Sequence, residues 1–407
     1  MPELLIPARD PETLRVAVLY GADAVYIGGE RLSLRAKAGN FTLPEMAESA
    51  AFAHERGVKV YVAANVFARD GDIAAARELL PVYAAAGADG FIISDPGMFR
   101  AARECAPEVP VHISTQANNT NAETWRFWYE LGVRRLVAAR ELSLAELRKI
   151  RAEIPEDMEI ECFVHGAMCI SYSGRCLISS FLTGRDANRG ACTHPCRFSY
   201  RLEEATRPGT YFPVEEDARG TYLYFSKDLC MIDHLPELAE AGIDSLKVEG
   251  RMKNALYVAG VARAYRRALD DLARSRETYE ANVPSYLAEI RQGGAREFCT
   301  GFFFGQPDAS AQDYEGGQAE QTARYLGLIE RDAEGRCFFR QKNKFSVGDE
   351  IVVMRPDGGD VPVRVRGLRD AGGHPVQSCP HPGQVILPDL GIELRPYDIL
   401  RTEASSC

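Results

Sequence analysis

The chain has 407 residues, 46% of them hydrophobic, and a formal net charge of −10. This length predicts two or three domains, or one large barrel with an appended domain, and the negative charge excludes a global field that attracts nucleic acid, so RNA binding would need a local basic patch. No run of about 18 apolar residues is present for a membrane span, and the N-terminus lacks the basic and apolar segments of a secretory signal, so we expect a cytoplasmic protein.

The first 275 residues repeat one pattern, in which a helical stretch ends in glycine and a short apolar strand follows. Glycine suits the left-handed residue after a helix C-terminus, and a nearly continuous apolar run is typical of a parallel strand buried on both faces. We predict eight strands, near residues 4, 24, 59, 90, 111, 134, 159 and 245. Amphipathic helices between them favour an α/β fold, a (β/α)8 TIM-like barrel. A doubly wound open sheet is the alternative, although no GxGxxG follows the first strand.

The predicted seventh and eighth strands are separated by about 80 residues, far more than a usual connection. We therefore expect a long insertion at about residues 166–244, with a hairpin formed by residues 198–204 and 221–226. Catalytic groups of such barrels lie on the face formed by the carboxyl ends of the strands. This topology can gather five insertion cysteines there: Cys169, Cys176, Cys192, Cys196 and Cys230, the last of which precedes a predicted helix.

Several thiols in polar loops indicate a shared partner. Disulfides are uncommon in the cytoplasm, and the odd total of 11 cysteines argues against a full disulfide framework. Zinc sites usually contain close Cys pairs, and only the spacing of Cys192 and Cys196 suits one. Thiolates from widely separated loops favour an iron–sulfur cluster, which takes four Cys ligands. Structural zinc and a set of unrelated thiols are the alternatives.

The insertion is also basic. It contains one acid, Asp186, in a span with five arginines: Arg175, Arg185, Arg189, Arg197 and Arg201. Guanidinium groups make bidentate contacts with phosphate and carboxylate. We therefore take Arg185, Arg189 and Arg197 as candidates for substrate binding, with a solvated arginine face as the alternative.

Polar side chains also follow other predicted strands. We take Asn65, Gln116 and Arg140 as candidates for substrate binding, and four later residues as candidates for catalysis: His165, Lys247, Glu249 and Arg251. A histidine can donate or accept a proton near neutral pH. Lys247 and Glu249 share one face of their strand, which places a charged pair inside or at the rim of the barrel, where buried charge is costly unless it is paired or used. The alternative is an ordinary polar rim with a structural histidine.

The last third of the chain changes character. A final amphipathic helix at residues 254–272 is followed by irregular sequence, and short alternating strands begin at about residue 321. These strands predict a small all-β barrel. We expect a barrel catalytic domain in residues 1–275, a connector in residues 276–320 and a β-domain in residues 321–407. The β-domain has no cluster of catalytic residue types, so we assign it a docking or structural role.

Four segments of the chain resemble peptidase family U32, the collagenase-like "unassigned" peptidases. They are ECFVHGAMCISYSGRCLISS (161–180), STQANNTN (114–121), GNFT (39–42) and SLKVEGRMKN (245–254). Members of this family that are understood resemble hydroxylases of RNA or of ubiquinone precursors, and they hold a 4Fe–4S cluster in a barrel. The length and the single small C-terminal domain are most similar to members that form 5-hydroxyuridine at the wobble position of tRNA in a prephenate-dependent reaction.

The resemblance implies a 4Fe–4S cluster on Cys169, Cys176, Cys192 and Cys230, with Cys196 as the alternative to Cys192. It also implies prephenate as a co-substrate, the anticodon loop of tRNA as substrate and a second family subunit as a candidate partner. Arg35, in SLRAKAGNF (33–41), matches a family motif at the active-site mouth.

Three other functions stay open: a U32-type peptidase, a hydroxylase of ribosomal RNA and a hydroxylase of a quinone precursor. The peptidase is disfavoured because the chain has no HExxH, no GxSxG and no other local nucleophile–base signature.

Overall fold

The computed structural model describes residues 1–34, 39–169, 171–172, 175–197, 202–203, 211–212, 227–294, 296–307, 311 and 322–403. The chain divides into two compact units. The first consists of Met1–Pro11, Ala24–Met252 and Arg296–Gln318, and the second of Glu12–Asp23, Lys253–Ala295 and Ala319–Cys407. Among the described helices, none combines the length and the apolar character needed to cross a membrane.

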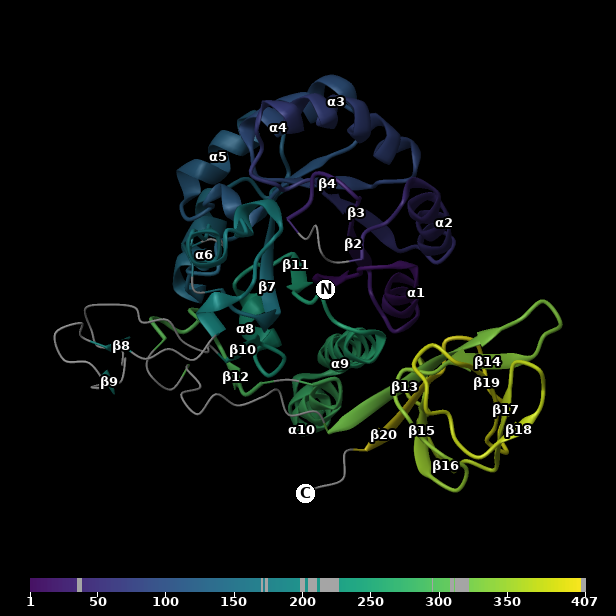
Figure 1. The fold of residues 1–407 in the computed structure, drawn as a ribbon. Coiled ribbons are helices and arrows are strands. Elements are labelled where there is room, and N and C mark those ends of the chain that lie inside the picture. Colours follow the sequence, from purple (N-terminus) through teal and green to yellow (C-terminus); the bar gives the residue numbers. More distant parts are fainter. Residues whose placement is uncertain are drawn as a thin grey trace. The chain divides into compact units, whose positions relative to one another are not determined.

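The first unit is built around a closed ring of parallel strands (Figure 1). Strands pair in chain order, and the last one pairs with both the first and the seventh, which closes the barrel. This closure confirms the predicted barrel and excludes the open sheet. The eight strands, all near their predicted positions, are β1 (Glu3–Pro7), β2 (Ala24–Gly28), β3 (Lys59–Ala63), β4 (Gly90–Ile93), β5 (Val111–Ile113), β6 (Arg135–Val137), β7 (Glu159–Ala167) and β11 (Ser245–Val248).

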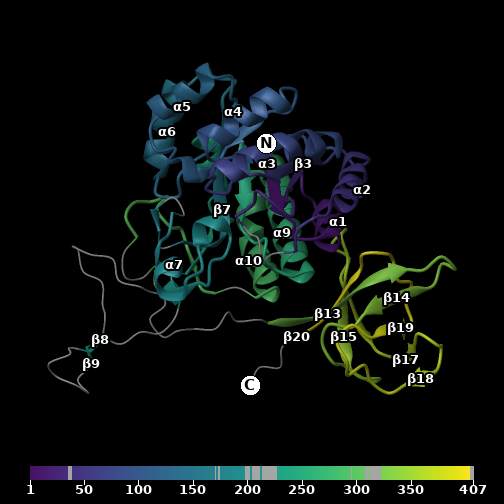
Figure 2. The ribbon, with the colours of Figure 1, turned by 45° about the horizontal axis from the view of Figure 1, so that its top comes forward.

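Helices α2 to α6 lie outside the strand ring (Figures 1 and 2). Local sequence sets where two of them begin. The side chains of Thr42 and Ser143 each accept a hydrogen bond from the backbone amide three residues later, and the glutamate at that position accepts one from the backbone amide of Thr42 or Ser143. Such capping boxes satisfy amide groups that the first helical turn leaves without a partner. The helices are α2 (Leu43–His54), α3 (Asp70–Ala85), α4 (Pro96–Cys105), α5 (Ala122–Glu130) and α6 (Leu144–Glu153); α1 (Pro11–Leu19) comes earlier in the chain.

The insertion leaves the barrel at the end of strand β7, which has nine residues, and its returning segment pairs with the same strand. The carboxyl half of β7 pairs antiparallel with β10 (Asp228–Cys230), with Asp228 opposite Ala167 and Cys230 opposite His165. Cys230 therefore ends a strand, and the following helix α8 (Leu235–Glu240) begins later than predicted. The insertion also contains α7 (Ile178–Thr183), the 3-10 turns η3 (Ala187–Arg189) and η4 (Pro195–Arg197), and the pair β8 (Leu202–Glu203) with β9 (Tyr211–Phe212).

The predicted hairpin at residues 198–204 and 221–226 falls mostly outside the described residues. Among the described residues, β8 pairs with β9. After the last barrel strand, a further short strand, β12 (Phe298–Cys299), pairs in parallel with β10.

Two long helices, α9 (Ala255–Arg274) and α10 (Arg276–Gln292), belong to the second unit. The sequence prediction included α9 but treated the region of α10 as irregular. Ser275 separates the helices and caps α10 by accepting a hydrogen bond from the amide of Thr278. Tyr286 and Asn282 on α10 donate hydrogen bonds to the buried carboxylate of Asp271 on α9, at 2.6 and 3.0 Å. These polar contacts, together with Pro284 inside the helix, explain why α10 lacks a clear apolar stripe.

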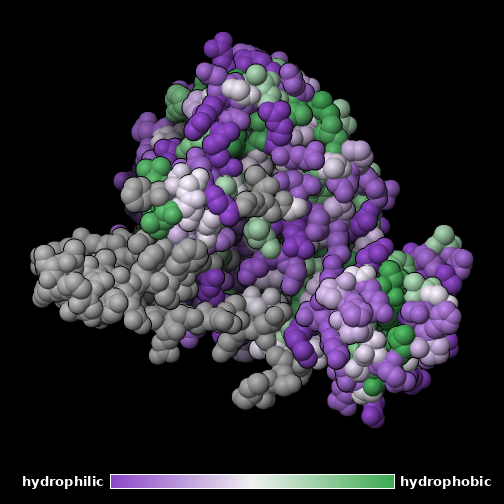
Figure 3. Space-filling view, viewed as in Figure 1, coloured by the Kyte–Doolittle hydropathy of each residue, from purple (hydrophilic) through white to green (hydrophobic). Residues whose placement is uncertain are grey.

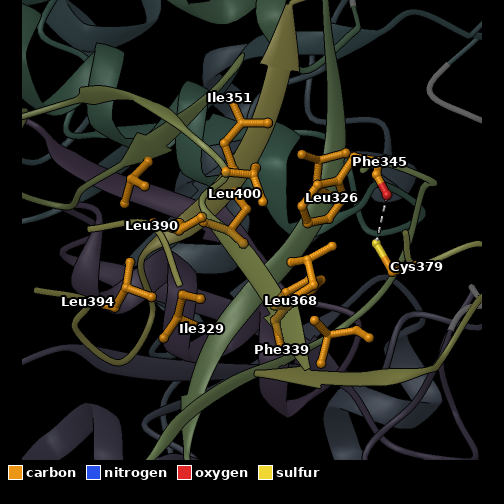
Figure 4. Close-up of a cluster of buried hydrophobic side chains, with 13 residues drawn as sticks. Leu326, Ile329, Phe339, Phe345, Ile351, Leu368, Cys379, Leu390, Leu394 and Leu400 are labelled. Atoms are coloured by element: carbon orange, nitrogen blue, oxygen red, sulfur yellow. Dashed lines mark hydrogen bonds between the residues drawn. The ribbon is translucent and has the colours of Figure 1, made fainter. Parts of the chain in front are cut away.

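The C-terminal part of the second unit is an antiparallel sheet of eight strands, as the alternating sequence predicts. Its order is β16-β15-β20-β13-β14-β19-β17-β18. The core in Figure 4 includes Leu326, Phe339, Ile351 and Leu400, and the Cys379 thiol donates to the carbonyl oxygen of Phe345 at 3.4 Å. The strands are β13 (Ala323–Arg331), β14 (Cys337–Arg340), β15 (Glu350–Met354), β16 (Val361–Arg364), β17 (Gly367–Asp370), β18 (Pro375–Val376), β19 (Val385–Asp389) and β20 (Ile399–Glu403).

The face of the molecule drawn in Figure 3 is mostly polar where residues are described. Figure 3 shows hydrophilic side chains over most of the face drawn, with hydrophobic side chains in small separate groups. Scattered apolar side chains are normal on a folded protein, so only a local concentration of them calls for an explanation.

Candidate functional site at the barrel mouth

A buried ion pair lies inside the barrel. The Nζ atom of Lys247 on β11 is 2.6 Å from Oε1 of Glu161 on β7, and both side chains are almost fully buried. The ring of Tyr26 lies beneath the ammonium group, with its centroid 4.6 Å from Nζ. Lys247 was predicted to share a charged face with Glu249, but its partner in the barrel is Glu161, which the sequence analysis did not single out.

Further charged residues connect this ion pair to the amino-terminal ends of the strands. Arg135 on β6 lies 3.6 Å from Glu161 and also pairs with Glu3 and Glu159. Burial and the nearby cations Arg135 and Lys247 hold the pKa of His112 well below its ordinary value, so this ring is neutral. Because every cation of the network has a carboxylate partner, the network can remain ionised without water.

His165 occupies the carboxyl half of β7 and is buried. Its carbonyl oxygen accepts a hydrogen bond from the amide of Glu249 at 2.8 Å. The next residue, Gly166, has a φ of +104°, and a Cβ there would lie 2.4 Å from the Glu249 carbonyl oxygen. Glycine at this position is therefore what allows the chain after β11 to approach β7 so closely.

Arg140 and Glu249 meet beside His165, at the strand ends. The Arg140 guanidinium lies 3.9 Å from the Phe163 ring centroid and donates a 3.4 Å hydrogen bond to the Ala167 carbonyl oxygen. One of its nitrogens is 4.0 Å from a carboxylate oxygen of Glu249. Both side chains are partly accessible, so this pair can meet a ligand that enters the mouth.

Arg251 lies at the end of β2 rather than beside Arg140. It is buried, and its Nη2 atom donates to the Ser33 hydroxyl at 2.7 Å. A Cβ at Gly28 would lie within 3.0 Å of both the Ser33 oxygen and the Arg251 guanidinium, so the pair fills the space that glycine leaves open. Asn65, after β3, accepts a hydrogen bond from the amide of Leu34 at 3.3 Å and thereby holds the same loop.

The insertion is fastened to the barrel by Arg189. This guanidinium makes two hydrogen bonds to the carboxylate of Asp72 on α3, at 2.8 and 3.2 Å, and one to the carbonyl oxygen of Phe67 at 3.1 Å. The Arg189 hydrogen bond lowers the pKa of Asp72. The charge of Arg189 is therefore already neutralised, and its predicted contact with phosphate remains a prediction.

Arg175 makes a second link. Its Nε and Nη2 atoms donate to the carbonyl oxygen of Gln116, at 3.0 and 2.6 Å. Gln116 lies in η1 (Thr115–Ala117), directly after β5. The guanidinium also lies 5.6 Å from the ring centroid of Phe67, so both arginines hold the insertion against the same loop. Arg185 is half-buried near α7, while Arg35 and the side chain of Arg197 lie outside the described residues.

The cysteine-bearing segments of the insertion are tied to one another. Asn188 bridges to the backbone of Cys176, accepting from its amide and donating to its carbonyl oxygen, both at 2.9 Å. The Ser179 hydroxyl accepts a hydrogen bond from the Thr193 amide at 3.1 Å, which fixes the chain beside Cys192. The amide of His194 donates to the sulfur of Cys192 at 3.4 Å.

The thiols of the insertion differ in their exposure. Cys176 and Cys230 are buried, Cys192 and Cys196 are partly buried, and Cys169 is exposed. None of the described cysteines is in a disulfide. Across the described ranges, no three His, Cys, Asp or Glu side chains lie close enough to hold a metal ion. The described side chains therefore show no site for a single metal ion, while the thiols have the donor chemistry that an iron–sulfur cluster needs.

Reversing the charge of Arg189 should loosen the insertion. Arg189→Glu places two carboxylates against each other, and the loss of a partly exposed pair of this kind costs about 1 kcal/mol. We expect the peptide bonds near Cys176 to be cut roughly fivefold faster in limited proteolysis. The exchanged double variant Asp72→Arg/Arg189→Glu restores the pair and should restore resistance. If the double variant stays sensitive and RNA affinity falls in both variants, Arg189 contacts phosphate instead.

A closed parallel barrel with polar side chains and a cysteine-rich insertion at the strand carboxyl ends defines an enzyme-type (β/α)8 scaffold. Residues 9–313 match peptidase family U32, and residues 321–401 match the C-terminal domain of that family. The chain therefore belongs to peptidase family U32, which confirms the resemblance found in the sequence.

Three curated relatives show how the family is named. The chain is 37% identical over 404 residues to "tRNA hydroxylation protein P1" of Bacillus subtilis, covering 98% of this chain and 94% of the relative. It is 41% identical over 307 residues to "Uncharacterized protease MJ0090" of Methanocaldococcus jannaschii, covering 75% and 73%. It is 35% identical over 325 residues to "23S rRNA 5-hydroxycytidine C2501 synthase" of Escherichia coli, covering 75% and 48%.

Proposed function

We propose that this protein is an RNA hydroxylase that forms 5-hydroxyuridine at the wobble position of tRNA. The observation that carries the proposal is the 37% identity, over 98% of the chain, to a protein named for tRNA hydroxylation. The match covers 94% of that relative, so the two chains agree in length, whereas the ribosomal RNA enzyme is matched over only 48% of its length.

The barrel mouth supports this assignment. An enzyme that acts on a base needs it out of the helical stack, and an anticodon loop offers an unpaired base at little cost. Arg140 and Glu249, partly accessible above the buried floor formed by Lys247 and Glu161, can donate and accept hydrogen bonds to the polar edge of a uracil ring. His165 lies on the neighbouring strand and is the candidate for proton transfer.

We further propose a 4Fe–4S cluster on Cys169, Cys176, Cys192 and Cys230, with Cys196 as the alternative to Cys192, and prephenate as the co-substrate. When bound, such a cluster supplies one-electron redox chemistry. The absence of disulfides among the described cysteines, and the hydrogen bonds that hold the segments of Cys176 and Cys192 in place, support the cysteine assignment.

Nucleoside analysis tests the proposed reaction. Deleting the gene should remove 5-hydroxyuridine and its derivatives from bulk tRNA, measured by mass spectrometry of digested tRNA, while other modified nucleosides serve as internal controls. Loss of hydroxycytidine from ribosomal RNA, with normal tRNA, would assign the protein to the ribosomal alternative. Normal nucleosides in both RNAs, with purified protein that degrades gelatin in the presence of iron chelators, would support the peptidase.

A further inference from the structure

We propose that Tyr172 and Arg175, in the described part of the insertion, form a platform that binds single-stranded RNA, with an unpaired base stacked on the tyrosine ring. This inference rests on the proposed RNA substrate. It adds the surface that holds the RNA while a neighbouring base enters the barrel mouth.

The first observation is a concentration of exposed apolar side chains. Tyr172, Leu177 and Leu182 are 57%, 75% and 49% exposed, and they lie within one short stretch of the chain. Elsewhere the described residues expose one other group of large hydrophobic side chains close together in the sequence, Phe127 and Leu131 at the end of α5. A short stretch that exposes three large apolar side chains is a candidate for binding a partner.

The second observation is the position of this stretch. The amide of Arg175 donates to the carbonyl oxygen of Tyr172 at 3.0 Å, so the two residues belong to one tight turn. Arg175 in turn is bound to the Gln116 carbonyl oxygen, directly after the carboxyl end of β5. The tyrosine is therefore held one turn away from the face of the barrel where the candidate site lies.

The third observation is the charge of Arg175. Its hydrogen-bond acceptor on Gln116 is a neutral carbonyl group, and no carboxylate in the described ranges lies within 4.0 Å of its guanidinium. Arg189, by contrast, is neutralised by Asp72. Arg175 is exposed and keeps its positive charge, so it can attract a phosphate that flanks a base on Tyr172.

An exposed aromatic ring next to an uncompensated arginine is the combination that single-stranded RNA prefers. Bases stack on aromatic side chains whatever their identity, and cationic groups follow the backbone. A purely apolar protein partner would not use the charge of Arg175, and the chain as a whole is acidic, with a net charge of −10. The local positive charge therefore favours RNA over a protein partner.

The test compares binding of an anticodon stem-loop RNA with binding of an RNA duplex, by fluorescence anisotropy on the full chain. Tyr172→Ala should weaken binding of the stem-loop about 5- to 150-fold, the range for loss of one stacked base, and should leave the weaker duplex binding unchanged. Tyr172→Phe keeps the ring and should bind as the wild type does. Arg175→Gln should reduce the slope of log Kd against log salt concentration by about 1.

Phe127→Ala on α5 is the matched control. The exposed fraction of Phe127, 55%, is similar to the 57% of Tyr172, but Phe127 lies on a barrel helix outside the insertion. It should leave affinity unchanged. Wild-type affinity in Tyr172→Ala, or equal losses in Tyr172→Ala and Phe127→Ala, overturns the platform while leaving the RNA substrate intact. A wild-type protein that binds neither RNA overturns the proposed function as well.

Discussion

Replacing Cys169 or Cys176 with alanine is expected to remove iron from the protein and 5-hydroxyuridine from tRNA together. A single all-thiolate cluster contains about four irons per chain and needs four Cys ligands, so loss of one ligand should abolish it. Anaerobically purified wild-type protein should be brown, and iron and sulfide analysis should give equal amounts of both. A deletion strain that carries Cys169→Ala should resemble the strain without the gene.

Cys162→Ala is the matched control for the ligand variants. Cys162 is buried in β7, outside the loops of the insertion, and burial raises the pKa of its thiol far above the ordinary value. This variant should keep its iron and its activity. Retained iron in Cys196→Ala and lost iron in Cys192→Ala would assign the fourth ligand, and the reverse result would exchange them. Stoichiometric zinc without iron, or rescue of tRNA hydroxylation by Cys169→Ala, would refute the cluster.

Removing Glu161 should destabilise the barrel by about 3–5 kcal/mol, the cost of leaving a buried charge without its partner. In Glu161→Leu the ammonium group of Lys247 loses its 2.6 Å ion pair and remains enclosed by aromatic rings. Arg135 is less affected, because it also pairs with Glu3 and Glu159. The free energy of unfolding should therefore fall mainly through Lys247.

The two tryptophans of the chain make this measurement specific. Trp125 and Trp128 both lie on α5, buried against the barrel, so fluorescence during urea unfolding reports on the first unit alone. The double variant Glu161→Leu/Lys247→Met replaces the pair by apolar side chains of similar size and should recover most of the loss. Glu104→Leu breaks two exposed ion pairs, with Arg77 and Arg100, and should leave the midpoint unchanged. Equal midpoints for Glu161→Leu and Glu104→Leu would show that the buried pair contributes nothing.

The strands of the barrel could be predicted because each is a local signal. A glycine at a helix end followed by an apolar run, as at Gly87 before β4 and Gly242 before β11, needs no knowledge of the rest of the chain. The alternating strands of the C-terminal domain are equally local. Helix α10 was missed because its buried polar contacts to Asp271 depend on a neighbouring helix.

The site was predicted only as a set of strand ends. The positions of His165, Arg140 and Glu249 follow from where β7, β6 and β11 stop, and the structure brings Arg140 and Glu249 together there. Partners far apart in the chain could not be read from spacing, and Arg189 with Asp72 is such a pair. Glu161 did carry a signal, since a charged residue in an apolar strand needs a partner, and Lys247 was the available cation.

Strand β7 gives the insertion a property of its own. Because Asp228 pairs with Ala167, the segments at both ends of the insertion are joined by strand pairing, which does not depend on the residues between them. The entropic cost of closing a loop depends only weakly on its length and rises by about 0.6 kcal/mol for each doubling. The insertion can therefore change in length at little cost to the stability of the barrel, and grafting a relative's insertion between Ala167 and Asp228 would test whether this segment sets substrate preference.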